Sequence, residues 1–206
     1  MEQKYIYVVF SATPYQIGKL IRKFTKETYN HVSIALDPEL IKLYGFARRY
    51  YHTPFYGGFV RESLSRYHVK GKVTRVCICK LPVSSAQYTE LEALLQQMHT
   101  HTDTYLYNHF SVLGALFRKP IRVKDAYTCV EFGVNILHKL GFVPDSHKYY
   151  TVGNLQQLLD PYTIYTGDIY PYTEYDTAYY TRWPVPFPIL TSIRDICRLI
   201  PRLAKK

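Results

Sequence analysis

The chain has 206 residues, 47% of them hydrophobic and 20% charged, with 22 tyrosines and a formal net charge of +10. This globular composition fits one domain with a sizeable core, and no segment holds the roughly 18 apolar residues in a row that a bilayer-spanning helix needs. The positive charge favours anionic partners such as nucleic acid, phospholipid head groups or wall polymers, but it does not choose among them.

The first part of the chain predicts strands and one basic helix. Four strands are expected, over residues 4–10, 31–36, 40–46 and 72–81. The N-terminus lacks the long apolar run and the small-residue cleavage site of a signal peptide, so it is interpreted as the first strand. An amphipathic helix is expected over 14–24, and a loop rich in Tyr, Pro and Gly over 51–59.

The second part predicts mostly helices, which are expected over 84–98, 109–117, 129–140, 154–159 and 189–203. Extended coil or short strands are expected over 161–188. The last helix is basic and amphipathic, with Cys197 on its apolar face. We expect the apolar face to pack on the domain and the basic face to be solvated; a helix that lies on a membrane is the alternative.

The four cysteines form no C-x-x-C pair, which argues against a zinc ribbon or a redox motif. We expect free thiols in a reducing cytoplasm, with one of Cys77 and Cys79 in the core and the other at the surface. His99, His101 and Asp103 have the residue types of a metal site, but their spacing at a helix end is typical of a solvated turn. The sequence therefore predicts no metal and no cofactor.

Cys129 lies in the most informative segment of the chain, DAYTCVEFG. Thr128 and Glu131 form a capping-box pattern, in which each side chain satisfies a free backbone N–H of the other residue; Ser84 starts a second such pattern. Cys129 would then be the first residue of a helix that ends before Gly141. There the free N–H groups and the helix dipole favour a thiolate, the nucleophilic form. The alternative is a small buried residue without chemistry.

A cysteine nucleophile needs a base, and usually a third polar group that orients the base. Of the eight histidines, His31 is the one that begins an alternating buried strand. A histidine at the edge of a strand and a cysteine at a helix N-terminus are the two halves of a papain-like site. In this chain the histidine precedes the cysteine, which is the reverse of the papain order.

Three segments resemble motifs of one family. NHVSIAL at 30–36 is similar to the S-H-V-G-I strand, and TCVEFG at 128–133 to the C-S-E-F-V helix start, of circularly permuted papain-like cysteine peptidases of the NlpC superfamily. YLYN at 105–108 is similar to the Y-D-Y motif that precedes that cysteine. The family includes YiiX-like amidases and relatives of lecithin retinol acyltransferase. The resemblance runs from about residue 5 to residue 165.

The resemblance implies an α+β fold in which a small antiparallel sheet packs against the cysteine helix, with additional helices. We therefore expect a permuted papain-like domain over residues 1–165. A Tyr- and Pro-rich wrapping segment and a basic amphipathic helix are expected over 166–206. The implied chemistry is acyl transfer or hydrolysis at an amide or ester bond, without a metal.

By the same resemblance Cys129 is the nucleophile and His31 is the general base. The third group of the family normally lies on the strand that follows the histidine strand, where this chain offers Tyr44 and no carboxylate or imidazole. A backbone carbonyl or a simple dyad are alternatives, and Glu62 is a further candidate, from a loop. The residues expected near the substrate are Tyr105, Tyr107 and Glu62.

Two functions stay open from the sequence. The first is a cysteine hydrolase or acyltransferase that acts through an acyl-enzyme on a small acylated, peptide or lipid substrate. The second is a catalytically silent module of the same fold that holds a lipid, a peptide or an anionic polymer, with a membrane or wall polymer as an anionic partner surface. Nucleic acid is disfavoured, because charge is its only support. The expected location is the cytoplasm, including the periphery of a membrane.

Overall fold

The computed structural model describes residues 3–53, 55–67, 73–114, 119, 121–170, 176–182 and 188–203. Its strands are β1 (Lys4–Ser11), β2 (His31–Ala35), β3 (Leu43–Arg48), β4 (Gly57–Glu62), β5 (Thr74–Val83), β6 (Leu106–Tyr107), β7 (Ala126–Tyr127) and β8 (Thr163–Ile169). Its α-helices are α1 (Gln16–Thr25), α2 (Ser85–Thr100), α3 (His109–Gly114), α4 (Cys129–Lys139), α5 (Val152–Leu159), α6 (Thr177–Thr181) and α7 (Pro188–Leu203). Short 3-10 helices are η1 (Leu64–Tyr67), η2 (Thr102–Thr104) and η4 (Asp160–Tyr162).

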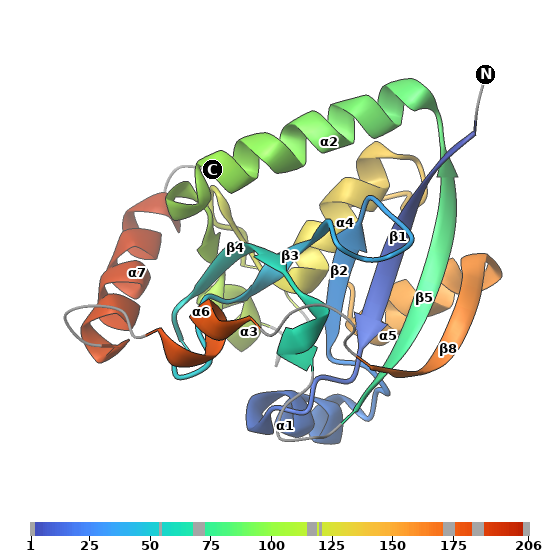
Figure 1. The fold of residues 1–206 in the computed structure, drawn as a ribbon. Helices are drawn as coiled ribbons and strands as arrows, with labels where there is room; N and C mark the ends of the chain where they lie inside the picture. The colour runs from blue at the N-terminus through green and yellow to red at the C-terminus, as the bar shows by residue number, and fades with distance from the viewer. Residues whose placement is uncertain are drawn as a thin grey trace.

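The eight strands form one sheet in the order β7-β6-β4-β3-β2-β1-β5-β8 (Figure 1). Neighbouring strands are antiparallel except β6 and β7, which are parallel. The expected α+β class is confirmed, but the sheet is mixed rather than wholly antiparallel. The boundary expected after residue 165 falls inside β8, which pairs with β5 from Thr163 to Ile169.

The sheet buries both of its faces. On one face α4 packs on β2 and β3, and α2 packs on β1 and β4. This main core includes Ile6, Val8, Phe10, Val32, Ile34, Phe46, Phe59, Leu95, Phe132 and Leu137. A smaller cluster on the other face contains Val9, Ala35, Leu43, Leu64 and Tyr67. Alternate residues of β2 therefore face different clusters, as the period of a strand requires.

Both predicted capping boxes form. The backbone N–H of Glu131 donates to Thr128 Oγ1 at 3.2 Å, and the backbone N–H of Thr128 donates to Glu131 Oε2 at 2.7 Å. Ser84 and Gln87 make the same pair of bonds at the start of α2. Gly141 follows α4 with φ +86°, a left-handed conformation that glycine adopts without strain. The local signals around Cys129 thus determine where α4 begins and ends.

β4 is the main departure from the predicted elements, because the sequence predicts a loop over 51–59. Gly57 and Gly58 carry that loop signal, yet they open a strand that pairs with β3 along its whole length. A β-carbon on Gly58 would overlap the carbonyl oxygen of Tyr105. The glycines therefore allow a close approach of two backbones, and β6 pairs with β4 at this point.

The stretch 161–188 differs in part from the predicted coil or short strands. Its described residues contain β8 and the short helix α6. Residues 171–175 and 183–187 lie outside the described part of the chain. The same is true of 115–117, at the end of the predicted helix over 109–117, of which α3 covers the first residues.

Cys77 and Cys79 both belong to the main core, so the expectation of one core and one surface position is wrong. Both sulfur atoms contact Thr163 Oγ1, at 3.6 and 3.5 Å. The physical reason is that residues two apart in a strand point to the same face.

Candidate functional site

Three segments far apart in the sequence meet at one end of β2. His31 begins β2, Glu62 ends β4, and Cys129 begins α4. α4 is held there because it packs on β2 and β3 and because its capping box fixes the first turn. β2 and β3 pair only near the end of β2 that lies away from His31. This limited pairing leaves room for side chains beside the imidazole.

The His31 imidazole is held by a buried carboxylate. His31 Nε2 lies 2.8 Å from Glu62 Oε1 and 3.1 Å from Glu62 Oε2, and the two side chains are 10% and 2% exposed. The Ser33 hydroxyl donates to Glu62 Oε1 at 2.9 Å, and the Tyr67 hydroxyl donates to Glu62 Oε2 at 2.7 Å. Each carboxylate oxygen therefore has two polar neighbours, which is the condition for burying a charge at tolerable cost.

The electrostatics of this pair favour two charged partners. Burial is the largest single influence and lowers the pKa of His31, but the negative charge of Glu62 and the hydrogen bonds to Cys129 and Glu62 together raise that pKa to about 10. Burial raises the pKa of Glu62, and the charge of His31, the Tyr67 hydroxyl and Arg66 together bring it below the ordinary value. At neutral pH the pair is therefore an imidazolium and a carboxylate.

Cys129 lies beside the His31 ring, where its thiol adds to the raised pKa of the imidazole. The Cys129 residue is 6% exposed, and it shares a cavity of about 190 Å³ with His31 and Glu62. Residues from other parts of the fold also line that cavity, among them Tyr15, Arg48, Phe55, Tyr67, Tyr107, His109 and Tyr179. The structure thus brings together the two residues that the sequence proposes as nucleophile and base.

The two tyrosines expected near the substrate have different positions. Tyr107 lines the cavity, and burial first and the nearby Cys129 second raise the pKa of its phenol well above the ordinary value. The phenol keeps its proton and remains a hydrogen-bond donor. Tyr105 instead packs its ring on Phe59 at 6.3 Å, and its carbonyl oxygen accepts from the Phe59 N–H. Tyr105 therefore supports β4 rather than the cavity.

Tyr44 does not contact His31, so its expected place as the third group is wrong. Its ring is stacked on Phe59 at 5.8 Å in the main core. Tyr44 pairs with Ile34 and faces the same side of the sheet, whereas the His31 side chain bonds on the opposite side. Glu62, a second candidate for this place and also expected near the substrate, occupies the position beside the imidazole.

A comparison of the chain with protein-family models, curated proteins and solved structures found no match. The chemistry of the site is therefore argued from its own residues. Among the described residues, no group of three or more His, Cys, Asp or Glu side chains is placed to hold a metal ion.

Gly45 of β3 makes the contact between Glu62 and His31 possible. A β-carbon at position 45 would overlap Glu62 Oε1 and would lie 3.1 Å from Ser33 Oγ. The missing side chain leaves the space through which the carboxylate reaches across β3 to β2. A glycine inside a predicted strand is a known signal of such close approach, and it is the signal by which sequence reasoning could have found Glu62.

We expect Gly45→Ala to lower the free energy of unfolding by about 1–3 kcal/mol, because the added methyl overpacks a buried polar site. The measurement is urea unfolding followed by circular dichroism. Gly133→Ala is the matched control, since its β-carbon would lie 3.4 Å from Leu155 Cδ2, an ordinary contact inside α4. There alanine should be neutral or should stabilise by up to about 1 kcal/mol. Equal stability of the two variants would contradict the role of Gly45.

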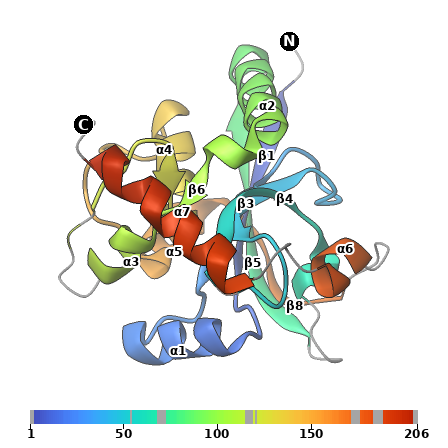
Figure 2. The ribbon, with the colours of Figure 1, turned by 90° about the vertical axis from the view of Figure 1, so that its left-hand side faces the viewer.

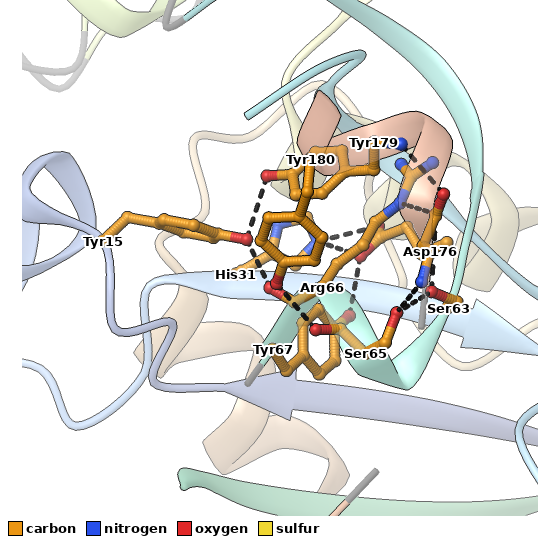
Figure 3. Close-up of polar contacts among 10 residues, drawn as sticks. Tyr15, His31, Ser63, Ser65, Arg66, Tyr67, Asp176, Tyr179 and Tyr180 are labelled. Atoms are coloured by element: carbon orange, nitrogen blue, oxygen red, sulfur yellow. Dashed lines mark hydrogen bonds and ion pairs between the residues drawn. The ribbon is translucent and has the colours of Figure 1, made fainter. Parts of the chain in front are cut away.

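A wall of the cavity comes from the C-terminal part of the chain, which sequence reasoning missed. Arg66 Nε donates to Asp176 Oδ2 at 2.8 Å, and the guanidinium lies 4.5 Å from the centre of the Tyr179 ring (Figure 3). The Tyr179 hydroxyl donates to the Tyr15 hydroxyl at 2.9 Å, which in turn donates to the carbonyl oxygen of Arg66. This network fixes η1, the turn that carries Tyr67.

Proposed function

We propose that this protein is a cysteine-dependent hydrolase or acyltransferase that acts on an amide or ester bond. The observation that carries the proposal is the shared cavity of Cys129 and His31, in which Glu62 holds the far side of the imidazole. The nucleophile, the base and the orienting group come from three separate segments. Contacts within each segment do not bring them together, and only the tertiary fold does. The permuted papain-like fold is part of the same proposal, supported by the order of histidine strand and cysteine helix.

The proposed reaction begins from the charged pair. Because Glu62 and Ser33 occupy His31 Nε2, Nδ1 is the nitrogen available to the thiol. An imidazolium beside Cys129 stabilises the thiolate, which attacks the carbonyl carbon of the substrate. His31 then gives its proton to the leaving amine or alcohol, and an acyl-enzyme remains on Sγ. Water or another acceptor loses a proton to His31, attacks the acyl group and releases Cys129.

The tetrahedral intermediate carries an oxyanion that needs hydrogen-bond donors. The backbone N–H of Cys129 is one donor, since the first N–H groups of a helix have no intrahelical acceptor. The Tyr107 hydroxyl is the second donor that the cavity offers, because it is protonated and lies near Cys129. Both donors would bind the oxygen more strongly as its negative charge develops.

A silent binding module is the second candidate, and the low exposure of Cys129 favours it. A nucleophile that is 6% exposed must be reached through the cavity, and an aromatic lining suits a bound apolar ligand as well as a substrate. The two candidates differ in the state of the thiol, because only the enzyme needs a reactive thiolate.

We expect iodoacetamide to label Cys129 at pH values below those at which it labels Cys197, the exposed cysteine of α7. The reason is that His31 stabilises the Cys129 thiolate, whereas Cys197 lies at an exposed position of α7. Peptide mass spectrometry over a pH series measures both thiols in one sample. In His31→Gln the Cys129 profile should move towards that of Cys197, and in urea the two should coincide.

Identical pH profiles for the two thiols in the folded wild type would reject an activated Cys129 and favour the binding module. Slow access of the reagent to a buried thiol lowers the labelling rate at every pH but leaves the midpoint of the pH profile unchanged. The urea sample, in which the chain is unfolded, gives the reference midpoint for each thiol.

A further inference from the structure

α7 docks on the body by a side that is polar except for Leu199, which packs with Leu106, Val123 and Ala126, and for the partly buried Leu203. Thr191, Asp195 and Leu199, which lie on one side of the helix, are 7%, 3% and 0% exposed. Arg198 and Arg202 on this flank donate to backbone carbonyl oxygens of the body, including that of Asp103 at 2.7 Å and that of Thr104 at 2.9 Å. In Figure 2 the helix lies across the face of the molecule turned to the viewer.

The apolar face of α7 consequently points away from the body. It is formed by Leu190, Ile193, Ile196 and Ile200, which are 53%, 50%, 36% and 56% exposed. Cys197 on the same side is also exposed. The expectation that this face packs on the domain is therefore wrong for Ile193, Ile196, Cys197 and Ile200, although Leu203 is partly buried. The packing of Leu199 and the hydrogen bonds from Arg198 and Arg202 to backbone carbonyls hold the helix in this orientation.

The charge on α7 is mostly positive and is compensated in part by one acid, since Asp195 Oδ1 lies 3.4 Å from Arg194 Nε and 3.4 Å from Arg198 Nη1. The Arg194 side chain is 58% exposed and that of Arg198 36% exposed, and the chain continues after α7 to Lys205 and Lys206. Asp195 is the one acidic residue of α7, and its side chain is 4% exposed. A helix with an exposed arginine, Arg194, beside four exposed aliphatic side chains has the pattern of an interfacial helix.

A second copy of the chain fits this face poorly. Two copies of α7 would bring arginine against arginine, since the only acid on the helix is buried. Four aliphatic side chains of one helix also fall short of the roughly 800 Å² per partner of a stable protein interface. Among the described helices none is long and apolar enough to cross a bilayer, so α7 would lie along the surface.

We propose that α7 anchors the protein on an anionic lipid bilayer. Leu190, Ile193, Ile196 and Ile200 enter the boundary between head groups and acyl chains, and Arg194 contacts the lipid phosphates and carboxylates. The proposal rests on the exposure and charge of α7 alone and holds whether or not Cys129 is a working nucleophile.

The test is cosedimentation of the full chain with vesicles of phosphatidylcholine alone and with vesicles that also contain phosphatidylserine. We expect binding to the anionic vesicles that weakens as salt is added. Ile193→Ser/Ile200→Ser should reduce the partition coefficient at least about tenfold, because two large aliphatic side chains no longer leave water. Ile41→Ser/Ile164→Ser is the matched control, since those residues are 51% and 57% exposed elsewhere on the surface. This control should bind like the wild type.

Three results would overturn the proposal: no sedimentation of the wild type with anionic vesicles, equal loss in both double variants, or no loss in either. A concentration-dependent dimer in analytical ultracentrifugation that Ile193→Ser/Ile200→Ser abolishes, without vesicle binding, would assign the face to a second copy instead. Far-ultraviolet circular dichroism of each variant verifies that α7 still folds.

Discussion

Cys129→Ala will abolish turnover of any substrate that forms an acyl-enzyme, with a loss in kcat/KM on the order of a thousandfold or more. Alanine removes the one sulfur that shares a cavity with His31, and no other described cysteine lines that cavity. His31→Gln should cause a loss of similar size, because nucleophile and base act as a unit and their losses are not additive.

The measurement is intact mass after incubation with panels of acylated peptides, wall peptides and acyl lipids. The wild type should gain the mass of the acyl group on Cys129 or turn the substrate over, whereas Cys129→Ala should do neither. Cys197→Ala is the matched control, since this exposed thiol lies on α7 and should leave turnover unchanged. Full turnover by Cys129→Ala of a substrate that the wild type consumes would remove the nucleophile from the proposal.

Glu62→Ala should lower the free energy of unfolding by about 3–5 kcal/mol, the usual result of removing one partner of a buried ion pair. The variant leaves a buried imidazole without its carboxylate, and it leaves the Ser33 and Tyr67 hydroxyls without their acceptor. Glu92→Ala is the matched control. Glu92 contacts Lys42 at the same 2.8 Å, but its side chain is 43% exposed, and such pairs contribute about 0–1 kcal/mol.

The difference between wild type and Glu62→Ala should depend on pH. The folded pKa of His31, about 10, lies above its unfolded value, so its contribution is complete below about pH 6.5 and is lost as pH rises towards 10. The folded pKa of Glu62 is lowered, so its contribution is complete above about pH 4.3 and is lost in acid. Urea unfolding over a pH series should therefore give the largest difference between about pH 4.3 and 6.5. A difference that does not vary with pH would show that Glu62 acts by packing alone.

The reactivity of Cys129 in Glu62→Ala adds an independent measurement. Burial lowers the pKa of His31, and the charge of Glu62 opposes this effect. Loss of the carboxylate lowers the pKa of His31 and leaves less imidazolium to stabilise the thiolate, so labelling of Cys129 by iodoacetamide should shift to higher pH. Gly45→Ala should shift it in the same direction, since the methyl group takes the place of Glu62 Oε1.

The site could be predicted from the sequence only as far as local hydrogen bonds determine it. Thr128 and Glu131 place Cys129 in the first turn of α4, and both partners of this capping box lie within four residues. His31 follows from the alternation of its own strand. The resemblance predicts Tyr44 as the third group because Tyr44 lies on the next strand in sequence, but the pleat turns that side chain to the opposite face.

The resemblance to a family implied the α+β class, and the sequence by itself determined both capping boxes, the start and end of the cysteine helix and the amphipathic character of the last helix. Each feature that the sequence determined depends on contacts between residues a few positions apart. Only the tertiary structure decided that Glu62 reaches His31 across Gly45, since that contact needs the register of three strands at once. It also decided the orientation of α7, because an amphipathic pattern specifies two faces but not which of them the body binds. The local sequence places Cys129 at the start of α4, whereas the tertiary fold brings His31 and Glu62 beside it.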